Sequence, residues 1–200
     1  MPRTARQDSF DASYYGRYYD SKKTRVHGSA EIARLCTAVT SFFDWWEHPL
    51  ESVLEIGAGV GLWRDWFAKN RPKARYRSTE VSAYACAKYG HEQRDISAWR
   101  AREKFDLVVC QGVLPYLDDA AAERAIENLG AMTRGFLYLE AITKRDLREV
   151  CDGALTDVKV HERTGAWYRA RLRRHYDEVG CGLWCKKGAR VLFYELERAE

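Results

Sequence analysis

The sequence predicts an α/β fold in which helices cover both faces of a mostly parallel sheet. Short apolar runs alternate with segments in which apolar residues recur at helical spacing. One run, residues 105–110, is almost continuously apolar, which is typical of a strand buried on both faces. A glycine-rich turn at residues 57–61 joins the first run to a helix-like segment. At 200 residues, the chain suits one domain with a full core.

The N-terminal region, residues 1–48, predicts a helical cap. Four tyrosines between residues 14 and 19 recur at helical spacing and would form one aromatic face with hydroxyl tips. This segment either docks on the core as an ordinary helix or covers the binding site as a lid. A second helix is expected to begin with Ser29 as its N-cap and to end before Pro49.

The central region, residues 49–142, predicts five strands separated by helices and turns. The expected strands are residues 53–56, 74–80, 91–96, 105–110 and 136–142, of which the third is the weakest. Helices are expected from residue 62 to Asn70, from Ser82 to Lys88 and from Asp119 to Met132.

The last region, residues 143–200, changes in character. An aromatic helix from Trp167 to Tyr176 carries four arginines, and residues 182–185 and 190–196 then flank a turn-forming stretch that predicts a hairpin. Neither a linker nor a repeat interrupts the sequence. We therefore expect one domain, 1–200, composed of the cap, a binding core and a last region of helices and hairpin.

The glycines at 57, 59 and 61 predict a ligand site, because a backbone without side chains lets a ligand approach closely. A dinucleotide fingerprint would need glycine at position 62, which is Leu62. A phosphate-binding P-loop would need Gly-Lys-Ser/Thr, and the first lysine after the glycines is Lys69. Phosphate recognition is therefore disfavoured, while a tight turn without any ligand remains the alternative.

The pattern acid-x-Gly-x-Gly-x-Gly, from Glu55 to Gly61, resembles motif I of the class I S-adenosylmethionine-dependent methyltransferases. The run from Phe105 to Leu117 is similar to the region of their small-molecule members that closes over the methyl donor. The resemblance implies a Rossmann-like fold with a mostly parallel seven-stranded sheet and an antiparallel last strand. It covers about residues 50–142 by motif and the terminal hairpin by topology. Residues 10–27 and 144–180 also resemble an uncharacterised bacterial group of these enzymes.

The resemblance implies S-adenosylmethionine as cofactor and S-adenosylhomocysteine as product, with no metal. Glu80 ends the second strand about 20 residues beyond the loop, where a carboxylate can accept hydrogen bonds from both ribose hydroxyls. A surface glutamate is the alternative. Asp95 and Ile96 suit an adenine amine and ring. The expected cofactor-binding residues are Glu55, Gly57, Ala58, Gly59, Gly61, Glu80, Val81, Asp95, Ile96, Gln111, Gly112 and Val113.

Acceptor-side residues are less clearly indicated. Methyl transfer from a sulfonium mainly requires alignment and exclusion of water, and it needs a base only for a hydroxyl or a protonated amine. The catalytic residue is not predicted, and the weak candidates are Tyr19, Tyr116, Glu140 and His161. Weak substrate-binding candidates are Tyr15, Arg25, Trp167 and Arg171. For His161 we favour an ordinary exposed or core histidine without a catalytic role. The arginines of a helix more often face solvent than contact a substrate.

A small-molecule acceptor is the favoured hypothesis. The Asn/Asp-Pro-Pro-Tyr and Pro-Cys signatures of nucleobase methylation do not occur, and the net charge of +4 is too small to indicate nucleic acid by itself. The alternatives are an RNA or protein methyltransferase, which would dock through residues 163–176, and a cofactor-binding protein without turnover. The six cysteines lack zinc-type spacing. Because neither a signal peptide nor a membrane span is indicated, we expect a cytoplasmic protein, of unknown oligomeric state.

Overall fold

A seven-stranded sheet forms the centre of the protein. The computed structural model describes residues 9–21, 23–25 and 27–199. The sheet has the strand order β3-β2-β1-β4-β5-β7-β6. The strands are β1 (Ser52–Ile56), β2 (Arg75–Glu80), β3 (Glu92–Gln93), β4 (Phe105–Gln111), β5 (Thr133–Glu140), β6 (Tyr176–Gly180) and β7 (Leu183–Lys186). The first five are parallel, and β7 is antiparallel to both of its neighbours. The predicted sheet is thereby confirmed.

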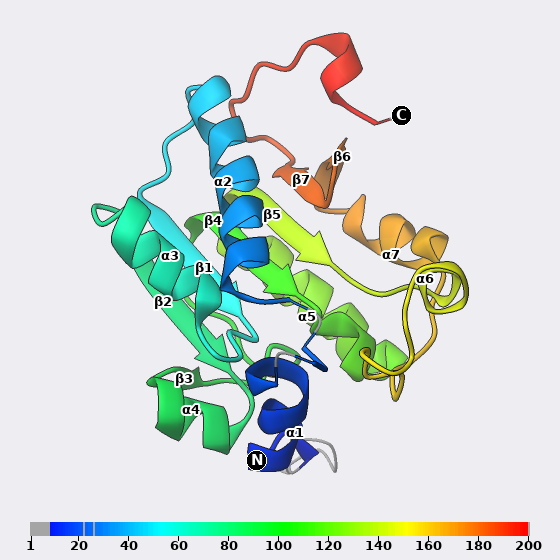
Figure 1. Cartoon of the computed structure of the whole chain (residues 1–200). Helices are drawn as coiled ribbons and strands as arrows, with labels where there is room; N and C mark the ends of the chain where they lie inside the picture. The colour runs from blue at the N-terminus through cyan, green and yellow to red at the C-terminus, as the bar shows by residue number, and fades with distance from the viewer. Residues whose placement is uncertain (1–8, 22, 26, 200) are drawn as a thin grey trace.

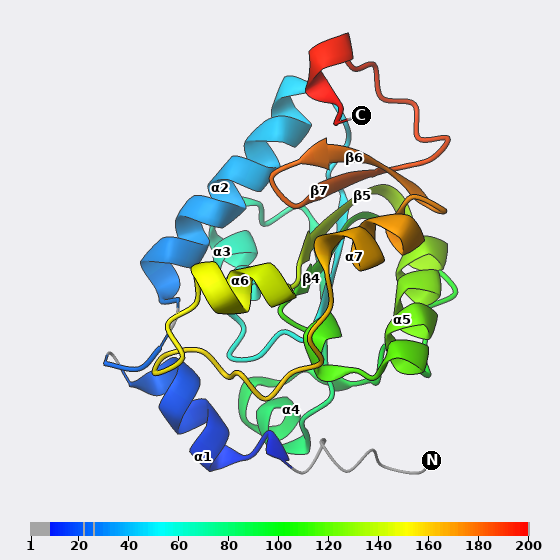
Figure 2. The same ribbon diagram turned by 90° about the vertical axis from the view of Figure 1, so that its right-hand side faces the viewer.

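Helices cover both faces of this sheet (Figures 1 and 2). One face packs against α2 (Ser29–Trp45) and α3 (Leu62–Asn70), and the other packs against α5 (Asp119–Met132) and α7 (Gly165–Leu172). Shorter elements lie around the carboxyl ends of the strands. They are α1 (Ala12–Tyr15), the π-helix η2 (Gly16–Asp20), α4 (Ala83–Tyr89), the 3-10 turn η3 (Leu114–Tyr116) and α6 (Lys144–Glu149).

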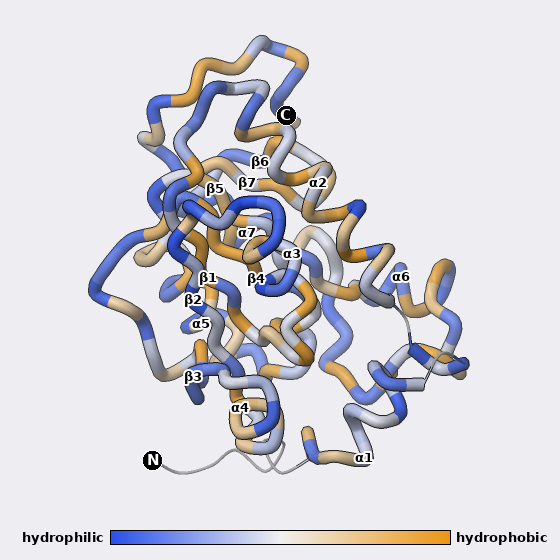
Figure 3. The backbone as a smooth tube through the Cα atoms, turned by 60° about the vertical axis from the view of Figure 1, so that its left-hand side comes forward, coloured by the Kyte–Doolittle hydropathy of each residue, from blue (hydrophilic) through white to orange (hydrophobic). Residues whose placement is uncertain are grey.

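The central strand β4 contributes side chains to two separate hydrophobic clusters. Leu107 and Val109 pack on the side of α2 and α3, whereas Val108 and Cys110 pack on the side of α5 and α7. All four are completely buried. Each aliphatic side chain buried in this way contributes about 1.5–3 kcal/mol relative to exposure. Figure 3 shows hydrophobic segments gathered in the middle of the molecule around β4 and β5.

The connections place a binding crevice between β1 and β4. From β1 the chain proceeds outward through β2 to β3, then returns to β4 on the other side of β1 and proceeds to β5. The loops after β1 and β4 therefore leave the sheet in opposite directions, and ligands of such sheets bind outside the carboxyl ends at this point. Ile56, Glu80, Gln111 and Glu140 end four neighbouring strands here.

The terminal hairpin lies earlier in the chain than predicted. It consists of β6 and β7, joined by Cys181 and Gly182, which both have positive φ (50° and 81°) as a two-residue hairpin turn of type I′ requires. The prediction of a strand at 190–196 was wrong, since η4 (Glu195–Glu197) lies there instead. The helix predicted to reach Tyr176 ends at Leu172. Tyr176 starts β6 because its ring is fully buried and its hydroxyl is 2.8 Å from Thr133 Oγ1.

Two helix starts, the start of the fifth strand and the extent of the third strand also differ from the prediction. The third strand was predicted at 91–96, but β3 contains only Glu92 and Gln93. Ser29 is the first residue of α2 and not its N-cap, because the Glu31 carboxylate accepts the Gly28 N–H at 3.0 Å. Asp118, one residue earlier than predicted, caps α5 by accepting from the N–H of Ala121. The fifth strand begins at Thr133 directly after α5, three residues before the predicted start.

Gly135 should be required for the pairing of β5 with β4. A Cβ atom at this position would lie 2.5 Å from the Asp106 carbonyl oxygen and 2.6 Å from His48 Nε2. We expect Gly135→Ala to lower the free energy of unfolding by about 1–3 kcal/mol, because the backbone must shift to make room. Urea denaturation measures this change. Gly153→Ala, where the nearest atom is 3.9 Å from the new Cβ, is the control. Equal stability of both variants would contradict the packing argument.

Candidate active site

Two neighbouring cavities lie at the carboxyl ends of the central strands. The larger has a volume of about 520 Å³ and the smaller one of about 100 Å³. They share Gly57, Gln111 and Gly112 together with Tyr14, Tyr19 and Tyr116. Every predicted cofactor-binding residue except Gly61 lines one cavity or the other. The structure thus brings together residues that are up to 58 positions apart, from Glu55 to Val113.

The glycine-rich loop forms the floor between the cavities. Gly57, Gly59 and Gly61 all have positive φ, at 71°, 57° and 84°. A Cβ atom on Gly57 would lie 2.3 Å from Val113 Cγ2, and one on Gly59 would touch the Tyr19 ring at 3.3 Å. Gly61 lies outside the cavity lining and serves as the N-cap of α3. The loop therefore needs glycine both for its conformation and for the space above it.

Glu80 holds this loop in position from the neighbouring strand. One carboxylate oxygen accepts the Gly59 N–H at 3.0 Å, and the other accepts the N–H groups of Val81 at 2.7 Å and Ser82 at 3.0 Å. Burial raises the pKa of Glu80, while the three backbone N–H groups oppose that shift. Since a carboxylate oxygen can accept two hydrogen bonds, the oxygen facing Gly59 retains one acceptor position toward the smaller cavity.

The smaller cavity has the lining expected for a flat heterocycle beside a polar edge. Ile96, Val81 and Val113 provide apolar contacts. Asp95 Oδ1 accepts from the N–H and the hydroxyl of Ser97, both at 2.8 Å, which fixes the carboxylate at the cavity.

Glu55 lies under the loop in a buried environment. Its Oε2 accepts a hydrogen bond from the Tyr76 hydroxyl at 2.7 Å. Burial raises the pKa of Glu55 to about 8, even though the Tyr76 hydrogen bond and the charge of Arg64 favour ionisation. The carboxyl group therefore contributes mainly as a neutral hydrogen-bonding group at neutral pH.

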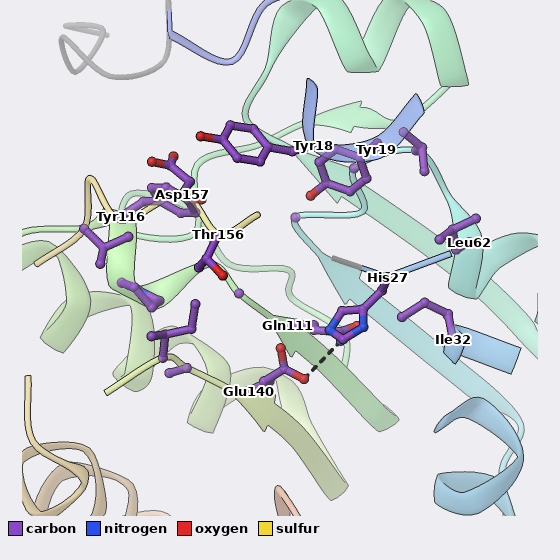
Figure 4. A pocket seen from close by; sticks show the side chains of 18 of the residues that line it. Tyr18, Tyr19, His27, Ile32, Leu62, Gln111, Tyr116, Glu140, Thr156 and Asp157 are labelled. Carbon is purple, nitrogen blue, oxygen red and sulfur yellow. Dashed lines mark hydrogen bonds between the residues drawn. The ribbon is translucent and has the colours of Figure 1, made fainter. Parts of the chain in front are cut away.

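A chain of side-chain hydrogen bonds crosses the larger cavity at the ends of β4 and β5. The indole N–H of Trp63 donates to Gln111 Oε1 at 2.8 Å. Gln111 Nε2 in turn donates to Glu140 Oε2 at 3.1 Å, which is the dashed line in Figure 4. The Trp63 bond determines which end of the Gln111 amide points toward Glu140. No sequence signal indicated this pairing.

Tyrosines of the N-terminal segment line both cavities. The hydroxyls of Tyr14 and Tyr116 lie 2.9 Å apart, and Tyr19 packs over Gly59. Tyr15 is buried beside the ring of Tyr84, with ring centroids 5.6 Å apart. Burial raises the pKa of Tyr14, Tyr15 and Tyr19 well above the ordinary value, so their hydroxyls remain neutral hydrogen-bonding groups.

The outer wall of the larger cavity comes from α6 and the chain between α6 and α7. Its lining residues include Asp146, Cys151, Asp152, Thr156 and Asp157. Sequence reasoning expected residues 143–200 on the acceptor side but singled out none of these five, because most of them lie in irregular structure without a motif.

Arg163 anchors that wall to the loop after β4. Its buried guanidinium donates to the carbonyls of Leu114 and Leu117 and to Asp119, and it stacks over Trp167 with the central carbon 4.7 Å from the ring centroid.

Four acceptor-side candidates lie outside both cavities. His161 is exposed, and Arg25 is partly exposed near Gly28. Arg171 donates to Glu123 at 2.6 Å and stacks on Trp167 at 3.7 Å. Tyr15, Tyr19, Tyr116 and Glu140 do line the cavities.

Within residues 9–21, 23–25 and 27–199, no group of three or more histidine, cysteine, aspartate and glutamate side chains is arranged to hold a metal ion. None of the helices among these described residues is long and apolar enough to cross a membrane.

The raised pKa of Glu55 predicts a specific pH dependence. Because the folded state binds this proton more tightly than the unfolded chain does, stability is lost as pH rises from about 4.5 toward 8. We expect Glu55→Gln to gain stability relative to wild type over this range, by about 1.4 kcal/mol for each unit of pKa shift. Urea denaturation of both proteins at several pH values checks this. A pH-independent difference would show that Glu55 does not titrate as inferred.

Solved structures with the same fold are methyltransferases. N-methyltransferase NodS from Bradyrhizobium japonicum WM9, with S-adenosylhomocysteine, matches with a TM-score of 0.64 and 19% identity over 92% of this chain and 100% of that chain. Magnesium protoporphyrin IX methyltransferase ChlM from Synechocystis PCC 6803 matches with a TM-score of 0.59 and 19% identity over 84% and 86%. The plantazolicin methyltransferase BpumL gives 0.61 and 14% over 84% and 68%.

Comparison with families establishes the relationship by sequence. A search of curated proteins found no match. The family model described as "Methyltransferase domain" matches residues 27–181, which is more than half of the chain and includes the glycine-rich loop, Glu80, Asp95 and the wall after α6. Together with the sheet order and the site at its switch point, this match shows that the chain belongs to the class I S-adenosylmethionine-dependent methyltransferases.

Proposed function

We propose that this protein transfers the methyl group of S-adenosylmethionine to a small molecule. The adenosine part of the donor would occupy the smaller cavity, between Glu80 and Asp95. The methionine part would follow the glycine-rich loop into the larger cavity, toward Gln111. The acceptor would then lie in the remainder of the larger cavity, against the wall formed after β5.

One observation carries this proposal. The glycine loop, Glu80 and Asp95 line two adjoining cavities at the switch between β1 and β4, where this sheet type binds ligands. The site also has a cradle that side chains would fill, because a Cβ atom on Gly57 would clash with Val113 at 2.3 Å. A remaining acceptor position on Glu80 suits a ribose hydroxyl.

The residues around the larger cavity would support the transfer by aligning the acceptor and by excluding water. When bound, S-adenosylmethionine supplies a methyl group on a positively charged sulfur. The chain aligns the acceptor with that carbon, and the Tyr14–Tyr116 contact and Tyr19 exclude water from above. Because the tyrosine hydroxyls stay neutral, they place no additional charge beside the positively charged sulfur.

The dimensions and charges of the site favour a small molecule over RNA or a protein. A cavity of about 520 Å³ is in the range of pockets for small ligands. The four arginines of α7 and the residues after it, which were the candidate docking surface, are paired within this chain. Arg169 and Arg173 contact Glu178, Arg171 contacts Glu123, and Arg174 lies 3.9 Å from Glu127. Among the structures with the same fold, NodS is named an N-methyltransferase, and ChlM is named for a small molecule, magnesium protoporphyrin IX.

Titration calorimetry with S-adenosylmethionine and S-adenosylhomocysteine tests the donor site. We expect both to bind wild type, and Glu80→Gln to weaken binding by about tenfold or more, which corresponds to about 1.4 kcal/mol. The reason is that glutamine must place its NH2 group against a backbone N–H of either Gly59 or Ser82, which displaces the loop.

Glu103→Gln is the control for the same chemical change on the surface, where Glu103 pairs with Arg75 and Arg77. Melting temperatures of both variants establish that they fold. Absence of binding to folded wild type would refute the proposed function. Unchanged affinity in Glu80→Gln would remove Glu80 from the donor site.

A further inference from the structure

The larger cavity has a strongly unbalanced charge. Five of the residues that line it carry carboxyl groups, of which Glu55 is mainly neutral at neutral pH. The described lining residues include one histidine, His27, but neither lysine nor arginine. The whole chain has the opposite balance, with 33 lysines and arginines against 29 acids. Because a cleft lined by one sign of charge concentrates its electric field, the cavity favours cations and repels anions.

All five carboxyl groups accept hydrogen bonds within the chain. Glu55 is held by a buried hydrogen bond to a tyrosine hydroxyl. Asp146 accepts from the N–H and the hydroxyl of Thr143, at 2.9 and 2.8 Å, and so caps α6. Asp152 and Asp157 each accept from the N–H two residues later, at 2.8 and 3.0 Å. Glu140 and Asp157 differ from the others in position, because Glu140 ends a strand of the sheet and Asp157 interacts with Tyr116 of the cavity lining.

Glu140 ends β5 directly opposite Gln111 of β4. Its Oε2 accepts from Gln111 Nε2 at 3.1 Å and from the Tyr138 hydroxyl at 3.4 Å. Its Oε1 accepts no hydrogen bond from the residues that the structure describes. The carboxylate is thus positioned by its neighbours and still has an oxygen available at the cavity.

Asp157 lines the same cavity and lies apart from Glu140, on the other side of the view in Figure 4. Burial raises the pKa of Tyr116, and the charge of Asp157 and a side-chain hydrogen bond to it raise that pKa further, so the Asp157 carboxylate contacts the Tyr116 hydroxyl. Aromatic rings attract cations through their faces, most strongly where water is excluded. The part of the cavity around Asp157 therefore combines a carboxylate with aromatic rings.

We infer that the acceptor is a small organic amine, which binds as an ammonium ion between Glu140 and Asp157. This inference rests on the proposed function, because it names the acceptor of the same site. Ile142, Leu155 and Val160 also line this cavity. The body that carries the amine is therefore apolar at least in part.

The reaction requires one proton to leave the acceptor before the methyl group arrives. An N–H bond of the ammonium ion breaks, its proton goes to the Glu140 carboxylate, and the electron pair stays on nitrogen. That pair forms the new N–C bond while the C–S bond breaks and its electrons remain on sulfur. The products are a methylated ammonium ion and neutral S-adenosylhomocysteine, and Glu140 releases its proton to water.

The same cavity suits other acceptors poorly. A carboxylic acid would be repelled by Glu140 and Asp157. An alcohol would gain no ion pair, and a carboxylate is a weak base for removing a hydroxyl proton. The difference in binding between an amine and an alcohol of the same shape is therefore the property to measure.

Calorimetric titration of the enzyme loaded with S-adenosylhomocysteine tests the inference. The probes are phenethylamine, phenethyl alcohol and hydrocinnamate, together with hexylamine, hexanol and hexanoate. We expect an amine to bind at least about tenfold more tightly than its alcohol, and the acids not to bind. Glu140→Gln and Asp157→Asn should each weaken amine binding by about tenfold or more without changing the affinity for S-adenosylhomocysteine.

Glu149→Gln, on α6 but outside the cavity lining, is the matched control and should leave amine binding unchanged. The inference is overturned if an alcohol or acid binds as tightly as its amine, if neither cavity variant weakens amine binding, or if no amine binds the loaded enzyme. Failure of S-adenosylhomocysteine to bind wild type is a separate result, because it refutes the proposed function itself.

Discussion

The site depends on one carboxylate that accepts three backbone N–H groups. Glu80 ends β2 and binds the N–H of Gly59 in the loop after β1, and it also binds the N–H groups of Val81 and Ser82 at the start of α4. These bonds connect two loops that meet at the edge of the sheet. A charge-assisted hydrogen bond is worth more than a neutral one, and it is costly to leave unmade in a buried place. Glu80 therefore holds the glycine-rich loop in place and is also the side chain proposed to bind the donor.

Segments outside the sheet complete the walls of the two cavities. The tyrosine-rich helices α1 and η2 contact the floor through Tyr19 and the β4 loop through Tyr14 and Tyr116. The wall after α6 is anchored by Arg163, whose guanidinium serves two carbonyls and one carboxylate. Since both segments lie outside the sheet, side-chain contacts help to determine where they lie. The acceptor cavity is consequently a product of side-chain anchoring, whereas the donor site is a product of the sheet.

The predicted fold was confirmed where local pattern and tertiary environment agree. The apolar run of β4 has one stable solution, a strand with hydrophobic clusters on both faces. Prediction failed at the hairpin, where residues 190–196 have the composition of a strand, yet Leu192 and Leu196 are more than 95% exposed. The burial of Tyr176 and the positive φ angles of Cys181 and Gly182 place the turn earlier. Neither is visible in local composition, because both depend on the β5 edge that the hairpin joins.

The sequence by itself determined the α/β fold class, the glycine-rich loop and the spacing that brings Glu80 and Asp95 to the carboxyl ends of the strands. Each of these is a short-range pattern within a strand-helix-strand unit. It also determined that an aromatic segment precedes the core. Only the tertiary structure decided that Trp63 orients Gln111 toward Glu140, that Asp157 and Glu140 line one cavity, and that the arginines after Trp167 pair with glutamates. These contacts join residues far apart in the chain, and their energies depend on distance and burial, which local sequence does not encode.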